Sequence, residues 1–287
     1  METLGSLAST FNSMIAASQD LYAEHGGEPA PDSTAAMEVS GHDVHLAEVT
    51  GTPRPVFGAY TDAEDKLRAL IDLTSSFSVL VVNSNMSVGQ VVVARAAIET
   101  AARMYWGLAV GYDYRERAAR WLRERLRSID EVAKLGKQAR LDMEESRFAV
   151  DILEGAARAG LAVRGPPPAA IDLIWPLVTA RQSPLEFDGI DREAAMLLFY
   201  RSPSALTHGS PHGLRAYFAN PGDDESRRFT RSESIETSLV LMAGLLNGFA
   251  NAHGALVALY GWDATGIGEA QSHAAQRLSS ALEHARS

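Results

Sequence analysis

The chain of 287 residues contains no cysteine. This absence excludes disulfide bonds, thiolate metal sites and a cysteine nucleophile, and it argues against a small secreted disulfide scaffold. Positive charge is also scarce, because 26 Lys and Arg residues face 36 Asp and Glu residues and leave a net charge of −10. Such a protein repels phosphate polymers over most of its surface, so any nucleic-acid role needs a local basic patch.

Strict two-residue alternation of apolar and polar residues is almost absent, whereas helical spacing of apolar residues dominates. We therefore predict an all-α fold, a single-domain bundle of about nine helices in which an N-terminal helix and a connection rich in Pro and Gly occupy residues 1–60 and the bundle domain occupies residues 61–287. A small β-hairpin could form over residues 214–230. The predicted helices cover about residues 4–24, 61–82, 87–110, 114–137, 140–159, 169–180, 191–208, 233–260 and 266–285.

One long run, Ser238 to Trp262, contains no Asp, Glu, Lys or Arg and is long enough to suit a membrane span. Two asparagines and His253 interrupt it, and the sequence has no second run of this kind, so we interpret it as a buried central helix. Gly244 and Gly248, four residues apart, would then allow another helix to approach closely. The N-terminus lacks the basic segment of a secretory signal, so we expect a cytoplasmic protein without a membrane segment.

Three charged residues, Arg95, Glu99 and Arg103, lie at four-residue spacing on the helix predicted from Ser87, which is otherwise apolar. This spacing places them on one stripe of the helix. Charges on a helix built for burial are unfavourable unless they are paired. Two interpretations stay open: an internal Arg–Glu–Arg ladder that fixes helix register, and the wall of a polar cavity that binds a ligand.

A second polar stripe, formed by Arg201, Ser204 and His208, is expected if the helix predicted from residue 191 continues. A histidine can act as an acid or a base near neutral pH. The alternative is structural, because His208 precedes Gly209 at the expected end of a helix, where an imidazolium interacts favourably with the last carbonyls.

The two stripes also carry a resemblance to a protein family. Arg201 and His208, with six residues between them, resemble the Arg-x4-6-His motif of the HEPN superfamily. The segments Arg95–Ala101 and Tyr200–His208 are similar to those of uncharacterised bacterial HEPN-like proteins, and the resemblance covers about residues 61–211. That superfamily comprises helical bundles, many of which are dimeric, metal-independent endoribonucleases in toxin and antiphage systems.

The resemblance implies that Arg201 contacts a scissile phosphate and that His208 assists proton transfer at the 2′-hydroxyl or the leaving oxygen, with Ser204 in support. Ser202 differs from the Asn, Asp or His that often follows the motif arginine, and Pro203 disturbs the helix inside the motif. Within the family, the alternative is therefore a protein that binds RNA without cleaving it.

A surface for RNA is predicted on the helix over residues 114–137, where four arginines share one face. Such a stripe could follow a phosphate backbone. Glutamates are interspersed with the arginines, so an ordinary solvated helix face is the alternative. The four predicted RNA-contact residues are Arg117, Arg120, Arg123 and Arg127.

Two other classes of function stay open. One is an enzyme or binding protein for a small anionic metabolite, held between the central helices. The other is a non-catalytic dimeric interaction module. The predicted binding residues near the central helices are Arg95, Glu99, Arg103, Tyr105, Trp106, His208, His212 and His253.

No cofactor and no metal are predicted. His42, His45 and Glu48 have ligand-like spacing, but the sequence shows no second cluster nearby that would complete a site. Phosphate-loop, dinucleotide-binding and serine-hydrolase motifs are absent from the sequence. We expect RNA or a small anion as the partner, and a homodimer as the assembly.

Overall fold

Every regular element that the structure describes is helical. The computed structural model describes residues 4–83, 88–108, 110–139, 145–163, 165–180, 183–187, 192–201, 203–204 and 231–286. No strand occurs in these ranges, which confirms the predicted all-α class. The same ranges contain eleven α-helices and one π-helical turn, more than the nine or so expected. The hairpin predicted over residues 214–230 lies outside the described residues.

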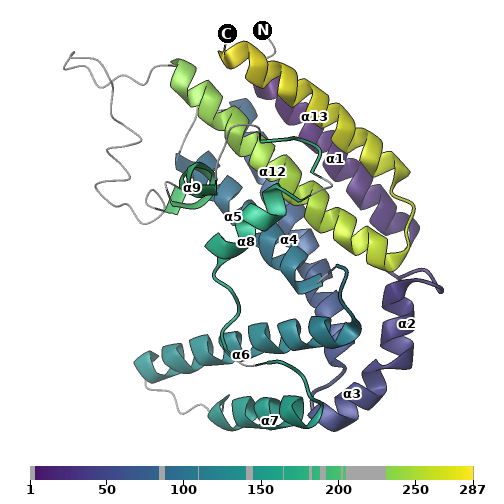
Figure 1. Ribbon diagram of the computed structural model, residues 1–287. Helices are drawn as coiled ribbons and strands as arrows, with labels where there is room; N and C mark the ends of the chain where they lie inside the picture. The colour runs from purple at the N-terminus through teal and green to yellow at the C-terminus, as the bar shows by residue number, and fades with distance from the viewer. Residues whose placement is uncertain are drawn as a thin grey trace.

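Five long helices build the main bundle (Figure 1). Helices α1 (Leu4–Glu24), α12 (Arg231–Tyr260) and α13 (Thr265–Arg286) lie side by side, and the two chain ends lie close together at one end of them. Helices α4 (Pro55–Asn83) and α5 (Val88–Leu108) pack along each other, with α5 against α12 and α4 against α1. The core therefore lies between these five helices.

The long run without charged residues, which begins at Ser238, lies in this core. Within α12, Ser238–Tyr260 is long and apolar enough to cross a membrane by composition, but 89% of its most apolar window is buried inside the protein. Among the described residues it is the one helix that passes this test. Its burial by neighbouring helices agrees with the predicted buried central helix.

The segment expected to be a connection contains two further helices, α2 (Thr34–Gly41) and α3 (Asp43–Thr50). Helix α4 also starts at Pro55, before the expected Thr61, so the boundary predicted between residues 60 and 61 falls inside a helix. The buried Asp43 carboxylate explains this start, because it accepts hydrogen bonds from the backbone N–H groups of Val56 at 2.7 Å and Phe57 at 3.1 Å. These are the free donors of the first turn of α4.

A second group of helices crosses one end of the main bundle. Helix α6 (Tyr114–Ala139) packs on α4, and α7 (Glu145–Arg158) lies beside α6 and against α3 (Figure 1).

Helix α8 (Ala170–Val178) packs on α5 and α12. Helix α9 (Arg192–Met196) leads into a π-helical turn, η1 (Leu197–Arg201), which contacts α5 and α12.

A buried ion pair joins these two groups of helices. Arg117 of α6 is 1% exposed, and its Nε donates to Glu38 Oε2 of α2 at 2.9 Å, while Nη2 donates to Glu38 Oε1. The Tyr60 hydroxyl of α4 donates to the same carboxylate at 2.8 Å, and Arg117 Nη1 donates to the carbonyl of Leu108 at 3.2 Å. Burial raises the pKa of Tyr60 well above its ordinary value, so Tyr60 stays a neutral donor.

We predict that Glu38→Gln lowers the free energy of unfolding by about 3–5 kcal/mol, because it leaves the Arg117 guanidinium buried without a counter-charge. Urea-induced unfolding followed by circular dichroism measures this loss. The control is Lys134→Met, at the exposed Lys134–Asp130 pair, which is expected to leave the unfolding midpoint unchanged. Equal effects of the two substitutions would contradict a structural role for the buried pair.

His253 of α12 is buried at 1% exposure, and neither of its ring nitrogens has a hydrogen-bond partner among the described residues. Its ring stacks on Phe249, with 5.7 Å between the ring centroids. Burial lowers the pKa of His253 to about 4, so the imidazole stays neutral at physiological pH. This placement puts His253 in the sealed core, where a ligand cannot reach it, and not in the predicted binding site.

A pH-dependent loss of stability follows from this burial. Below pH ~6.5 the unfolded chain binds a proton at His253 that the folded chain does not bind, so stability falls as the pH drops toward about 4. We predict that His253→Leu removes about 3 kcal/mol of this acid destabilisation, which urea unfolding at several pH values measures. Parallel pH profiles for the wild type and the variant would refute this prediction.

Candidate functional site

Arg95, Glu99 and Arg103 form a polar row on α5, and these side chains make ion pairs but remain partly exposed to solvent. The Arg95 Nε and Nη2 atoms donate to Glu99 Oε1 at 3.1 and 2.9 Å. Arg103 Nη1 donates instead to Glu124 Oε1 of α6 at 2.9 Å. The predicted continuous Arg–Glu–Arg ladder is thus only half formed. The side chains of Arg95, Glu99 and Arg103 are 14–26% exposed, so the row lies at the edge of the core, within reach of solvent.

The first residue of this row contacts the segment that carries the second polar stripe. The guanidinium carbon of Arg95 lies 4.8 Å from the centroid of the Tyr200 ring, a cation–π contact. The next residue, Arg201, is 55% exposed, and its Nη1 atom lies 3.5 Å from Glu193 Oε1. Ser204 is partly exposed. The structure therefore brings Arg95 and the start of the predicted Arg201 motif together.

The predicted residues His208 and His212 lie outside the described residues. Within the described part, the regular helix expected from residue 191 is interrupted by the π-helical turn η1. Pro203 gives a physical reason, because it cannot donate to the carbonyl of Phe199 and its ring would clash with that carbonyl in a regular α-helix. Single π-helical turns occur frequently at functional sites.

Helix α12 holds η1 in place through close packing. Phe199 of η1 is fully buried, and a Cβ atom added to Gly244 of α12 would lie 2.4 Å from its ring. Glycine is therefore needed here for the two elements to approach. A Cβ at Gly248 would make ordinary contacts, at 3.4 Å from Leu177 and 3.5 Å from Ala101. The predicted role in close helix approach thus applies most strongly to Gly244.

The arginine face of α6 is oriented differently from the prediction. Arg117 lies in the core, so it cannot contact RNA, and this part of the predicted stripe is wrong. The side chains of Arg120, Arg123 and Arg127 are 14–32% exposed, and each lies within 4 Å of a glutamate carboxylate. The arginines turn inward because the end of α5 supplies acceptors: Arg120 Nη1 donates to the carbonyl of Trp106 at 2.6 Å.

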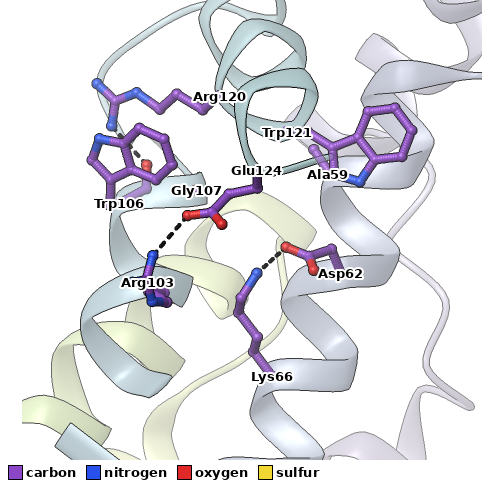
Figure 2. A pocket seen from close by; sticks show the side chains of 9 residues that line it. All are labelled: Ala59, Asp62, Lys66, Arg103, Trp106, Gly107, Arg120, Trp121 and Glu124. Carbon is purple, nitrogen blue, oxygen red and sulfur yellow. Dashed lines mark hydrogen bonds and ion pairs between the residues drawn. The ribbon is translucent and has the colours of Figure 1, made fainter. Parts of the chain in front are cut away.

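A hollow lies where α4, α5 and α6 meet (Figure 2). The empty space between its walls is about 220 Å³ with open solvent included, and the room that it leaves for a bound molecule is roughly that of one water. Lys66 forms an ion pair with Asp62 on the α4 side, and the Arg103–Glu124 pair bridges α5 and α6. Charged groups of both signs therefore face one space. The principal lining residues are Asp62, Lys66, Arg103, Trp106, Trp121 and Glu124.

Only part of the predicted binding set reaches this hollow. Arg103 and Trp106 line it, whereas Arg95 and Glu99 lie further along α5. Tyr105 is partly buried and packs against the hydrophobic core. Among the described residues no group of three or more His, Asp or Glu side chains could hold a metal ion.

Sequence reasoning missed Asp62, Lys66 and Glu124 as site residues. Their signal is weak, because Asp62 and Lys66 form an ordinary i,i+4 pair and Glu124 resembles the other glutamates of a charged helix. Their convergence depends on the crossing of α4 and α6, which is a tertiary feature.

Comparisons with protein-family models, with curated proteins and with solved structures find no match for this chain. Function is therefore inferred from the arrangement of the residues. Two regions stand out, the contact of Arg95 with Tyr200 beside Arg201 and the hollow at Arg103, and the polar row of α5 connects them.

We predict that Gly244→Ala lowers the free energy of unfolding by about 1–3 kcal/mol, because the new methyl group overlaps the Phe199 ring. The matched control is Gly254→Ala in the same helix, where an added Cβ meets no atom within 4 Å. That control is expected to keep or raise stability by up to about 1 kcal/mol, since alanine favours helix. Urea unfolding of both variants tests the difference, and a harmless Gly244→Ala would show that η1 is not held by this contact.

Proposed function

We propose that the chain is a HEPN-like protein that binds RNA and cleaves it as a metal-independent endoribonuclease, with Arg201 and His208 as its catalytic pair. The observation that supports this function is the contact of Arg95 with Tyr200. It joins the two segments on which the family resemblance rests, Arg95–Ala101 and Tyr200–His208, although they lie far apart in the sequence. We further propose that the protein is cytoplasmic and acts as a homodimer.

In this proposal Arg201 binds the scissile phosphate. Its guanidinium is more than half exposed, and the carboxylate beside it, Glu193, is 81% exposed and 3.5 Å away, so a phosphate can compete for it. A planar guanidinium donates two parallel hydrogen bonds to phosphate oxygens. The partly buried Tyr200 ring, fixed by Arg95, lies next to Arg201 and offers an apolar contact for a nucleobase.

His208 supplies the proton transfer. A neutral imidazole accepts the proton of the ribose 2′-hydroxyl while that oxygen attacks the phosphorus, and a proton returns to the leaving 5′-oxygen. The products are a 2′,3′-cyclic phosphate and a free 5′-hydroxyl, so the reaction consumes no water in this step. Ser204, four residues before His208 in the sequence, assists by hydrogen bonding in this proposal.

The decisive test is RNA cleavage in the presence of EDTA. The wild type is expected to cut single-stranded RNA, and His208→Ala is expected to reduce the rate at least ~100-fold, the usual contribution of a general acid or base. Arg201→Ala is expected to weaken RNA binding and its dependence on salt. His273→Ala, at an exposed histidine of α13, is the matched control and keeps full activity.

The outcomes separate cleavage from binding. Salt-dependent RNA binding that Arg201→Ala weakens, without any cleavage, would identify a protein that only binds RNA. A His208→Ala variant as active as the wild type would end the catalytic assignment. Circular dichroism of each variant shows that a loss of activity is not a loss of fold.

A further inference from the structure

The contact between Arg95 and Tyr200 has a counterpart at the other end of the polar row of α5. There the guanidinium carbon of Arg120 lies over the Tyr112 ring, 5.0 Å from its centroid, and over the Trp106 ring at 5.2 Å. At each end of the row, an arginine side chain therefore lies against an aromatic ring in a favourable cation–π arrangement.

The two ends lie on one face of α5. Trp106 follows Arg95 by eleven residues, which is about three helical turns, so the two side chains leave the helix in nearly the same direction. Arg103, three residues before Trp106, lies on the same face. The helix rises by about 16 Å over these eleven residues. A strand of stacked nucleotides covers this length with about five residues, at about 3.4 Å each.

Arg120 is fixed at its end of the row by two hydrogen bonds. Its Nε atom donates to Glu116 Oε1 at 2.7 Å, and its Nη1 atom donates to the carbonyl of Trp106 at 2.6 Å, the bond drawn in Figure 2. Its side chain is only 14% exposed, so it is better placed to hold the Tyr112 ring than to bind a phosphate. Tyr112 itself is 60% exposed, so its ring is accessible to a planar partner.

The charges along this face favour a polyanion only slightly. Five arginines share four carboxylate partners, because Glu116 pairs with Arg120 at 2.7 Å and with Arg123 at 3.5 Å. In a protein of net charge −10, most of the affinity for RNA therefore has to come from stacking of bases on aromatic rings. Stacking needs bases that are not paired, which single strands offer and duplexes do not. The five arginines are Arg95, Arg103, Arg120, Arg123 and Arg201.

We propose that the substrate is single-stranded RNA that lies along α5 from Tyr200 to Tyr112. A base beside the scissile phosphate stacks on Tyr200, and a base about five nucleotides away stacks on Tyr112. Arg120 is a positioning residue, because it holds the Tyr112 ring and does not contact the RNA. This inference rests on the proposed ribonuclease function, since Arg201 marks the end of the row at which the RNA is cut.

Binding of RNA strands of different lengths tests the extent of the contact. Oligouridylates with methylated 2′-oxygens are suitable probes, because they lack the attacking hydroxyl and are not cut. By fluorescence anisotropy, we expect a six-nucleotide strand to bind at least ~10-fold more tightly than a two-nucleotide strand. A methylated duplex of twelve base pairs is expected to bind at least ~10-fold more weakly than the six-nucleotide strand. Equal affinities in either comparison would overturn the proposal.

Variants of the two residues at this end of the row test the position of the strand. Tyr112→Ala is expected to weaken binding of the six-nucleotide strand at least ~5-fold, the effect of one lost base stack, and Tyr112→Phe keeps the ring and the affinity. Phe148→Ala, at a 41% exposed aromatic residue of α7, is the matched control. Arg120→Met is expected to reduce the ratio between the affinities for six and two nucleotides, which a general loss of fold would not do.

The failure of this inference is distinguishable from the failure of the proposed function. Six-nucleotide binding that Arg201→Ala weakens and Tyr112→Ala does not would overturn the path along α5 and retain the proposed function. A wild type that binds neither strand would overturn both.

Discussion

The fold depends on one buried guanidinium. Arg117 cannot lie in the core unless its donors are occupied, and Glu38 and the Leu108 carbonyl occupy them. These partners come from α2 and the end of α5, so a single side chain fixes α6 against two other helices. Apolar packing alone would tolerate several crossing angles, whereas a bidentate ion pair tolerates few. The position of α6 follows from it, and so do the positions of Arg120 and Glu124, three and seven residues along the same helix.

The placement of α6 also decides how the polar row of α5 is neutralised. Glu99 lies four residues from both Arg95 and Arg103, so local spacing alone allows either pair. Glu124 of α6 takes Arg103, and Glu99 therefore pairs with Arg95. Ion pairing and access to solvent are compatible here, because these side chains are partly exposed and lie at the rim of the core.

Long amphipathic or apolar helices could be predicted from the sequence, and features that depend on distant partners could not. The bounds of α1, α6, α12 and α13 follow closely from apolar spacing and flanking glycine or proline. Helices α2 and α3 were not predicted, because their segments are short and are stabilised by tertiary contacts. One such contact joins the Asp43 carboxylate of α3 to the backbone N–H of Val56 at the start of α4. The burial of Arg117 depends on Glu38, 79 residues away in the sequence. The sequence of the helix that contains Arg117 therefore predicts only a solvated face of arginines. The hollow could not be predicted from the sequence either, because Gly107 in its wall resembles any other glycine near the end of a helix.

Two buried polar residues in the uncharged part of α12, Asn247 and His253, have opposite effects on the fold. The Asn247 amide donates to the carbonyls of Val178 at 2.9 Å and Leu185 at 2.8 Å, and its oxygen accepts from the Leu185 N–H at 3.1 Å. It thereby fixes Leu185, two residues from Phe187, whose ring meets Phe199 of η1 at 5.6 Å between centroids. His253, whose ring nitrogens have no hydrogen-bond partner among the described residues, contributes an acid-sensitive weakness. Through these contacts Asn247 connects α12 to residues that pack on η1, the element that carries Tyr200 and Arg201.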